Sequence, residues 1–451
     1  MNEELLMNEV LEIFALEDPK VFRENFLSYH PFDLALVFAE LTYEQRQYVY
    51  NLLSPDELAP ILVHLDLNEI INYFNEMNSI YIAHLLEAMD VDDAVDILVE
   101  IKERNRIASY LSVMNKEEAM QIRKLLQYDE KTAGSIMTTN YLVIPVGYDV
   151  KQAMKKMIRE ASEAETIYIL YVINDESQLV GTLSLRDLII ARGNEFIKDI
   201  MTTKVISVSP DMDQEEVAQI IRNYDLNAIP VIDYQNHLLG IITVDDIVDV
   251  INEEASEDYE RFAAVPDIEE SFEQNAWKNA LSRLPWLLLL LILGLANSNI
   301  MNLFSATLNE KVVLSLFLPL IAGMAGNTGT QTLAVTIRKI AYKKLSSKEK
   351  VNHIVKESMT GVIIGIVTSI IAFLLIYVIQ QDFIIAFLVG ISILTSLIVA
   401  TAFGALVPLI MVRFKIDPAV ASGPFITTLN DLISMLIYLG LATILLQNII
   451  N

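Results

Sequence analysis

At 451 residues the chain is long enough for several domains, and its 53% content of hydrophobic residues is high for a soluble protein. The formal net charge of −27 argues against nucleic acid as a partner and favours cations, and the absence of cysteine excludes disulfides and thiolate metal sites. The acidity is uneven. The first 283 residues hold 22 basic and 53 acidic side chains, whereas the rest hold 10 basic and 6 acidic ones. The chain starts without a secretory signal, so we expect a cytoplasmic N-terminal half.

Residues 1–129 have the apolar periodicity of short helices, as in LSPDELAPILVHL and MDVDDAVDILVEIK. Ser-Pro, Asp and Asn recur at the points where such helices would begin. The pattern predicts an all-α, superhelical N-domain.

Residues 130–250 contain an internal repeat with boundaries at 130–198 and 199–250. SIMTTNYLVIPVGYDVKQAM is echoed 64 residues later by DIMTTKVISVSPDMDQEEVA, and YVINDESQLVGTLSLRDLI is echoed by PVIDYQNHLLGIITVDDIV. Each copy predicts a strand, a helix, two strands joined by a turn, and a second helix. We therefore expect a paired α/β domain.

This pair resembles the cystathionine β-synthase (CBS) domain pair, on the segments GTLSLRD and GIITVDD. CBS pairs commonly bind adenosine nucleotides, and the resemblance makes Ser184, Arg186 and Asp187 candidates to hold ATP. The same letters are explained without a ligand if Ser184 and Thr243 only cap their helices.

Residues 243–283 form a predicted acidic connecting helix and linker. Asp246, Asp249, Glu253, Glu257 and Glu260 recur at intervals of three and four residues, which places their carboxylates along one helix face. Like charges at this spacing repel one another unless a cation lies between them. A solvated acidic face is the alternative.

Residues 284–451 form a predicted five-helix transmembrane domain, with apolar stretches at 284–304, 312–337, 358–380, 384–412 and 424–448. Each is long enough to cross about 30 Å of hydrocarbon. Basic residues concentrate in the connection 338–357 and near Arg413, which predicts that both connections are cytoplasmic. We therefore expect a multi-pass protein of the plasma membrane with a cytoplasmic N-terminus and an extracellular C-terminus.

Two of these stretches carry polar motifs. PLIAGMAGNTGTQTLAV places Asn327 and Gln331 in the second span, and DPAVASGPFITTLNDLISML places Thr428 and Asp431 in the fifth. An ionised acid at this depth costs about 2.5–3.5 kcal/mol or more if it faces lipid. We therefore expect Asp431 to face protein or water. Structural pairing is the alternative to a functional role, but the spans contain no interior basic residue to pair with it. Oxygen ligands of this kind suit hydrated Mg²⁺ better than a soft transition metal.

The whole chain, 1–451, resembles the MgtE family of magnesium channels, on the letters PLIAGMAGNTGTQ, RLPW and DPAVASGPFITTLND. The resemblance implies a homodimeric pore in which Asp431 binds hydrated Mg²⁺ near Asn327, together with feedback closure by cytosolic Mg²⁺. It places the regulatory metal sites at Asp92, Asp96, Asp246, Asp249, Glu253, Glu254, Glu257, Asp258 and Asp417.

Other functions remain open from the residues alone. Asp431 would serve a proton- or sodium-coupled secondary transporter equally well. An intramembrane enzyme is disfavoured because no H-E-x-x-H or G-x-S-x-G motif is present. A membrane sensor that transports nothing leaves the polar second span unexplained.

Overall fold

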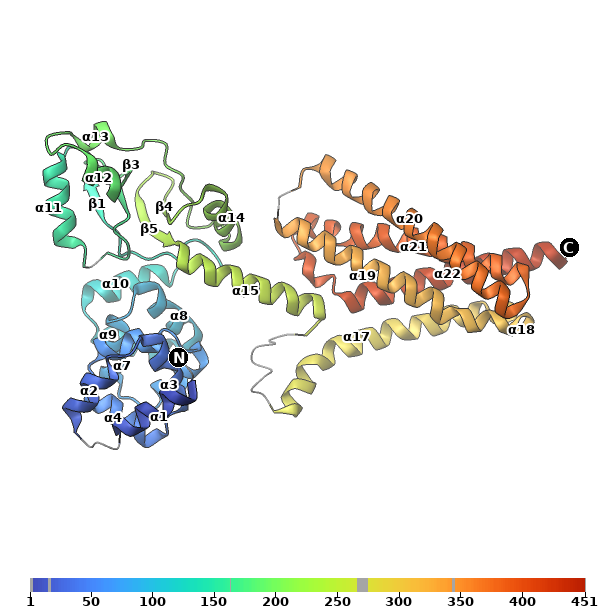
Figure 1. Ribbon diagram of the computed structural model, residues 1–451, viewed down its shortest axis with the longest axis horizontal. Helices are drawn as coiled ribbons and strands as arrows, with labels where there is room; N and C mark the ends of the chain where they lie inside the picture. Colours follow the sequence, from blue (N-terminus) through green and yellow to red (C-terminus); the bar gives the residue numbers. More distant parts are fainter. Residues whose placement is uncertain (1–2, 15–17, 163, 266–274, 343–344, 451) are drawn as a thin grey trace. The chain divides into compact units, whose positions relative to one another are not determined.

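The computed structural model describes residues 3–14, 18–162, 164–265, 275–342 and 345–450 (Figure 1). The chain divides into two compact units, Met1–Ile251 and Asn252–Asn451. The elements that lie in or begin in the first unit are α1 (Glu3–Phe14), α2 (Pro19–Phe26), α3 (Pro31–Glu40), α4 (Tyr43–Leu52), α5 (Pro55–Leu62), α6 (Leu67–Phe74), α7 (Ser79–Glu87), α8 (Val91–Ile101), α9 (Arg104–Val113), α10 (Lys116–Leu125), β1 (Val143–Pro145), α11 (Val150–Glu160), β2 (Ile169–Ile173), β3 (Leu179–Ser184), α12 (Leu185–Ile190), α13 (Ile197–Ile200), α14 (Gln214–Tyr224), β4 (Ala228–Ile232), β5 (Leu238–Thr243) and α15 (Val244–Ala263).

The N-domain consists of the short helices α1–α10, as the periodicity predicts. Several begin at a capping residue followed by proline, as at Asp18, His30 and Ser54. This pattern satisfies the free N–H groups of the first turn and presets the backbone for a helix. The helices bury a shared core in which Phe22, Phe38 and other aromatic rings are almost fully enclosed.

The repeat pair folds into two small sheets. The first has the order β1-β2-β3, in which β2 is parallel to β1 and antiparallel to β3. The second consists of the antiparallel strands β4 and β5. The predicted first strand of the second copy is reduced to a single parallel bridge between Val208 and Val231. Otherwise both copies have the predicted order of elements.

The two copies exchange short segments. Thr138 of the first Met-Thr-Thr motif pairs with Ile241 on β5 of the second copy, through N–H···O distances of 2.9 and 3.0 Å. Thr202 of the second motif pairs with Thr182 on β3 of the first copy in the same way. Each sheet is thus completed by residues that belong, along the chain, to the other copy.

The second unit contains the apolar helices. Its elements are α17 (Ala276–Leu303), α18 (Ser305–Glu310), η1 (Val312–Phe317), α19 (Leu318–Tyr342), α20 (Ser347–Gln380), α21 (Phe383–Arg413), η2 (Pro418–Val420) and α22 (Gly423–Ile450). Within the described part of the chain, five segments are long and apolar enough to cross a membrane: 276–303, 312–341, 347–380, 383–413 and 423–445. The predicted number of spans and the all-helical class of this domain are confirmed.

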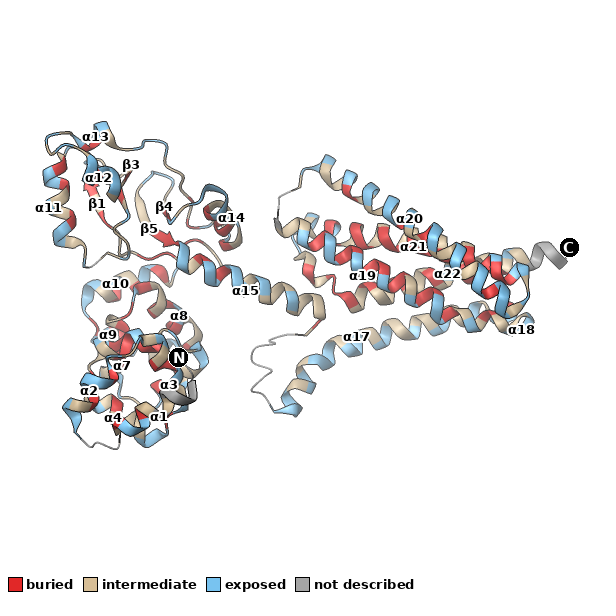
Figure 2. Ribbon diagram, in the orientation of Figure 1, coloured by how far each residue is buried: buried red, intermediate tan, exposed pale blue. Residues whose placement is uncertain are grey.

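Helix α21 is the centre of this unit and packs against α19, α20 and α22. Its buried residues form much of the apolar core, whereas α17 has no buried residue in the single chain (Figure 2). The helices are longer than the predicted spans. Helices α19 and α20 extend through most of the basic connection 338–357, because hydropathy marks the part of a helix that lies in lipid and not its ends.

Candidate functional site

Helices α19 and α22 meet through small and polar side chains. A Cβ atom on Gly326 would lie 2.8 Å from Thr427 Cγ2, and a Cβ atom on Gly329 would collide with the side-chain amide of Asn430. The glycines therefore allow the polar side chains of α22 to lie directly against α19. A hydrogen bond of 3.0 Å between the hydroxyls of Thr330 and Thr427 joins the two helices at the same level.

Asp431 lies in this contact. Its Oδ1 atom is 3.4 Å from the position that a Cβ on Gly326 would occupy. The same oxygen is buried and has no hydrogen-bond partner among the described residues, and this also holds for the amide atoms of neighbouring Asn430. Unpaired buried polar groups are costly, especially where one is a carboxylate. The contact thus has the chemistry of a site completed by water or a cation.

The other predicted pore residues lie around this acid. Asn327 and Gln331 are exposed on one face of α19 in the single chain, in line with Gly323. Thr428 is partly buried on α22 and donates its hydroxyl hydrogen to the Pro424 carbonyl at 2.9 Å. Asp431 therefore lies next to Gly326, which directly precedes Asn327 in α19. The exposed polar side chains of Asn327 and Gln331 continue along this helix.

A second polar site lies within the first unit, between α8 of the N-domain and the start of α15. Asp92 and Asp93 on α8 lie close enough to Asp246, and to Asp90 at the cap of α8, for these charges to raise the pKa values of Asp92 and Asp93. The amide of Asn140 donates to Asp90 Oδ1 at 3.1 Å and ties this helix end to the repeat pair.

The protonation of these acids is strongly perturbed. Burial raises the pKa of Asp92 to about 8, and the charges of Asp246 and Asp93 add to this effect. Burial, with Asp90 and Asp246 nearby, raises the pKa of Asp93 to about 6. Burial and the surrounding acids raise the pKa of Glu165 to about 7. Carboxylates with this combination of burial and mutual repulsion are stabilised by a cation.

Three of the predicted regulatory residues, Asp92, Asp246 and Asp249, belong to this cluster, and a fourth, Asp96, lies outside it. Asp246 has its pKa raised by burial, although hydrogen bonds from the Thr243 backbone and hydroxyl oppose the rise. Asp249 contributes to the raised pKa of Asp93, and Asp96 is exposed one turn further along α8. The sequence reasoning missed Asp93 and Glu165. Asp93 could have been recognised from the DVDD sequence at the start of α8. Nothing in the sequence near Glu165 indicates that acids from α8 and α15 surround it.

A third group of acids lies in the second unit, at the end of α15. Arg261 makes an ion pair with Glu257 at 2.7 Å and a second one with Asp417. Asp417 also accepts a hydrogen bond from the Ala419 backbone at 2.7 Å and so caps η2. Two residues predicted to bind regulatory Mg²⁺ are therefore joined here by an internal guanidinium.

Of the remaining predicted metal ligands on α15, Glu253 belongs to the predicted stripe, whereas Glu254 and Asp258 do not. Burial raises the pKa of Asp258, and the charge of Glu254 one turn away raises it further, while Arg261 and Arg338 lower it. Glu253 is exposed. Phe262, at the end of α15, packs on the apolar cluster formed by Leu333, Ala421 and Ile426. This packing holds the last turn of α15 close to the entry of α22.

Two of the three candidate nucleotide residues, Ser184 and Asp187, are hydrogen-bonded to each other at the start of α12. The Ser184 hydroxyl accepts from the Asp187 backbone at 3.1 Å and donates to Asp187 Oδ2 at 2.6 Å, and Arg186 is exposed. Helix capping accounts for the first two residues in this structure. Within the described residues, no three His, Asp or Glu side chains are already arranged as a metal site.

This architecture defines a multi-pass membrane protein with polar side chains between two of its apolar helices and an acidic N-terminal half. Family models agree with that class. The MgtE divalent cation transporter model matches residues 318–441, the MgtE intracellular N domain matches 29–131, and the CBS domain matches 133–194 and 197–253.

The chain is 40% identical over 440 residues to the magnesium transporter MgtE of Bacillus subtilis (strain 168), covering 97% of both chains. It is 42% identical over 458 residues to that of Enterococcus faecalis (strain ATCC 700802 / V583), covering 99% of both. The solved cytosolic domain of the Mg²⁺ channel MgtE in complex with ATP is 33% identical, with a TM-score of 0.51 over 54% of this chain and 99% of that one. The chain belongs to the MgtE family. The resemblance inferred from the sequence is confirmed, as is the prediction that the protein is not an enzyme.

The raised pKa values of Asp92, Asp93 and Glu165 predict a pH-dependent stability of the first unit. Between pH 4 and 8 the folded unit retains protons that the unfolded chain releases, so stability falls as pH rises through this range. We expect the melting temperature without divalent ions to fall by several degrees between pH 5 and pH 8, and added Mg²⁺ to reverse the fall.

Calorimetric melts of wild type and Asp92→Asn test this prediction, with Asp56→Asn as the control because Asp56 is exposed in the same unit. The slope should be shallower in Asp92→Asn and unchanged in the control. An equal slope in all three proteins would contradict the prediction.

Proposed function

We propose that this protein is a homodimeric magnesium channel that admits Mg²⁺ and closes when cytosolic Mg²⁺ binds its acidic half. The observation that carries the proposal is the buried, unpaired carboxylate oxygen of Asp431 beside the glycines of α19. The near full-length similarity to proteins named magnesium transporters supports Mg²⁺ as the ion.

The pore would be built around Asp431, with Asn327, Gln331 and Thr428 along the same path. Mg²⁺ loses its water reluctantly, so a site for it needs groups that hydrogen-bond to coordinated water as well as a negative charge. Amide and hydroxyl side chains supply the first requirement, and the carboxylate supplies the second. A single chain contributes one such acid.

A second copy of the chain would complete this path. In the single chain, Asn327 and Gln331 are exposed on a helix that crosses the membrane, where polar groups facing lipid are unfavourable. Two-fold symmetry would turn these faces toward a common axis and bring two Asp431 carboxylates together, and rings of acids select cations.

Regulation would arise from the two acidic sites outside the membrane spans. At the first, a cation between Asp92 and Asp246 would offset burial and repulsion and hold the N-domain against the repeat pair. At the second, a cation would compete with Arg261 for Glu257 and Asp417. Because ligands shift a conformational equilibrium only by their differential affinity, several such sites acting together give a steep response.

The charge distribution supports the location and orientation. The basic residues around 338–357 and at Arg413 favour a cytoplasmic position of these connections by the positive-inside rule. The N-terminus would then be cytoplasmic and the C-terminus extracellular.

ATP is proposed as a ligand of the repeat pair. The support is the related cytosolic domain solved in complex with ATP, together with the family resemblance of the segment that contains Ser184, Arg186 and Asp187. Binding through Ser184 or Asp187 would have to break their mutual hydrogen bond of 2.6 Å. Nucleotide binding would therefore compete with the cap of α12.

Replacing Asp431 by Asn should reduce Mg²⁺ flux at least tenfold, because the amide keeps the shape of the side chain but removes the charge that attracts the ion. The measurement is Mg²⁺ uptake into proteoliposomes at equal pH on both sides. Glu310→Gln is the control, since it removes one exposed charge from the same unit. Wild-type flux in Asp431→Asn would refute the assignment.

Replacing Asp92 and Asp246 together by Asn should weaken closure, so that flux persists at cytoplasmic Mg²⁺ concentrations that shut the wild type. The neutral amides no longer need a cation, so Mg²⁺ binding would no longer favour the compact state. Asp56→Asn with Asp129→Asn removes the same charge at exposed positions. If both pairs close like the wild type, the regulatory role of the buried acids is wrong.

Replacing Arg261 by Ala should lower the Mg²⁺ concentration needed for half-maximal closure, because the guanidinium that competes with Mg²⁺ for Glu257 and Asp417 is removed. Arg261→Lys keeps the charge and should remain close to the wild type. The readout is flux against cytoplasmic Mg²⁺. A higher half-closing concentration in Arg261→Ala would show that the guanidinium supports closure and does not compete with Mg²⁺.

A further inference from the structure

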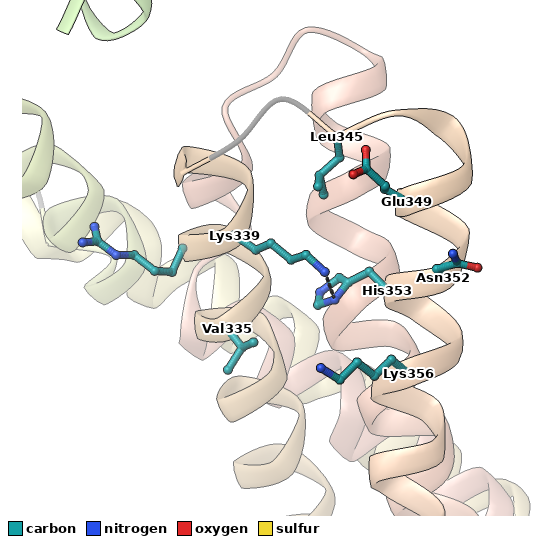
Figure 3. A pocket seen from close by; sticks show the side chains of 8 residues that line it. Val335, Lys339, Leu345, Glu349, Asn352, His353 and Lys356 are labelled. Carbon is teal, nitrogen blue, oxygen red and sulfur yellow. Dashed lines mark hydrogen bonds between the residues drawn. The ribbon is translucent and has the colours of Figure 1, made fainter. Parts of the chain in front are cut away.

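A basic cavity lies where the last turns of α19 meet the first turns of α20 (Figure 3). Its volume is about 520 Å³, and Val335, Arg338, Lys339, Asn352, His353 and Lys356 are among its lining residues. Lys339 extends from α19 and Lys356 from α20 into the space between these helices (Figure 3). The cavity is far along α19 from Asn327 and belongs to neither the pore nor the acidic sites.

The charges of this cavity favour an anion. Glu349 is the one acidic residue among its described lining residues, and its Oε2 atom accepts hydrogen bonds from the Ser346 backbone at 2.9 Å and hydroxyl at 2.7 Å. Its charge therefore serves the cap of α20. Arg338 shares its charge with Asp258, whose pKa it lowers. Lys339 and Lys356 are the two lysines among the described lining residues of the cavity.

Lys339 is held in place by a buried histidine. The Thr336 hydroxyl gives its hydrogen to the Thr332 carbonyl at 2.8 Å, so it must accept from His353 Nε2 at 3.0 Å. Nδ1 is then the acceptor for the Lys339 ammonium group, 3.1 Å away. Glu357 Oε1 is 3.8 Å from Nδ1, beyond hydrogen-bond distance. A neutral ring thus orients the ammonium group and leaves its charge available.

The surface beyond the cavity is apolar. Glu349, Asn352, His353 and Lys356 are spaced so that they share one face of α20. The same face continues with Met359, Ile363 and Val367, which are 57%, 63% and 54% exposed in the single chain. A ligand that fills both regions has an anionic head and an apolar tail.

We propose that this cavity binds the phosphate group of an anionic phospholipid, with the acyl chains along the exposed face of α20. Basic pockets between transmembrane helices at the membrane surface are suited to such head groups. The lipid would bridge α19 and α20 across their short connection. This proposal does not depend on the transport mechanism.

The test uses the purified full-length protein in a neutral detergent, with phosphatidylglycerol or phosphatidylcholine added. Native mass spectrometry measures retained lipid, and a thermal melt measures stabilisation. The main variant is Lys339→Gln with Lys356→Gln. Lys348→Gln with Lys350→Gln is the matched control, because these residues belong to the same basic connection but are not among the described cavity residues.

Wild type and control should retain phosphatidylglycerol over phosphatidylcholine, and the main variant should retain at least tenfold less phosphatidylglycerol. Equal retention of the two lipids by the wild type would overturn the proposal, as would an equal loss in the control pair. Displacement of phosphatidylglycerol by millimolar inorganic phosphate would identify a site for a soluble anion and overturn the lipid assignment.

Lys356→Gln alone keeps the contact between Lys339 and His353. If the double variant does not fold, phosphatidylglycerol retention by this single variant tests the proposal. Reduced phosphatidylglycerol retention in this variant supports the proposal, and wild-type retention overturns it.

Discussion

A carboxylate inside hydrocarbon has to meet water, a cation or a protein partner, and the contact between α19 and α22 provides no protein partner for Asp431 Oδ1 among the described residues. The local sequence follows from this constraint. Glycines on α19 make room for the polar side chains of α22, and threonine hydroxyls join the helices at the same level. The helices are packed closely, yet they leave a polar group unsatisfied where a transported ion could satisfy it.

Outside the membrane spans, repulsion between buried carboxylates also produces a site that a cation would stabilise. Asp92 and Asp246 are held close together although burial and mutual charge make this unfavourable without protons or cations. Arg261 shows the opposite solution, since a guanidinium from the chain pairs with both Glu257 and Asp417 and reduces their repulsion. The protein therefore contains both a cation-deficient acid cluster and one that supplies its own cation, and these would respond differently to ionic conditions.

The architecture was predictable because it depends on signals that are local in the chain. Apolar length identifies the spans, Ser-Pro, Asp and Asn mark the starts of most N-domain helices, and the repeated segments define the paired sheets. Asp431 could be singled out because no other charge lies near it in the sequence. Glu165 could not, since its acidic neighbours come from α8 and α15, and the role of Arg261 depends on a contact with a residue 156 positions away. Such proximities follow from tertiary packing, which the periodicity of one chain does not encode.

The exchange of Met-Thr-Thr segments also bears on how the chain is made. The first sheet is completed by Thr202, which follows β3 closely in the sequence. The segment around Thr138, by contrast, pairs with Ile241 on β5, which is synthesised about a hundred residues later. The N-domain core is continuous with residues of this second sheet, including Ile229 and Ile242. On a ribosome that releases the N-terminus first, the earliest residues to emerge therefore belong to the core that is finished last. The nascent chain has to keep this surface from other partners until β5 has been synthesised.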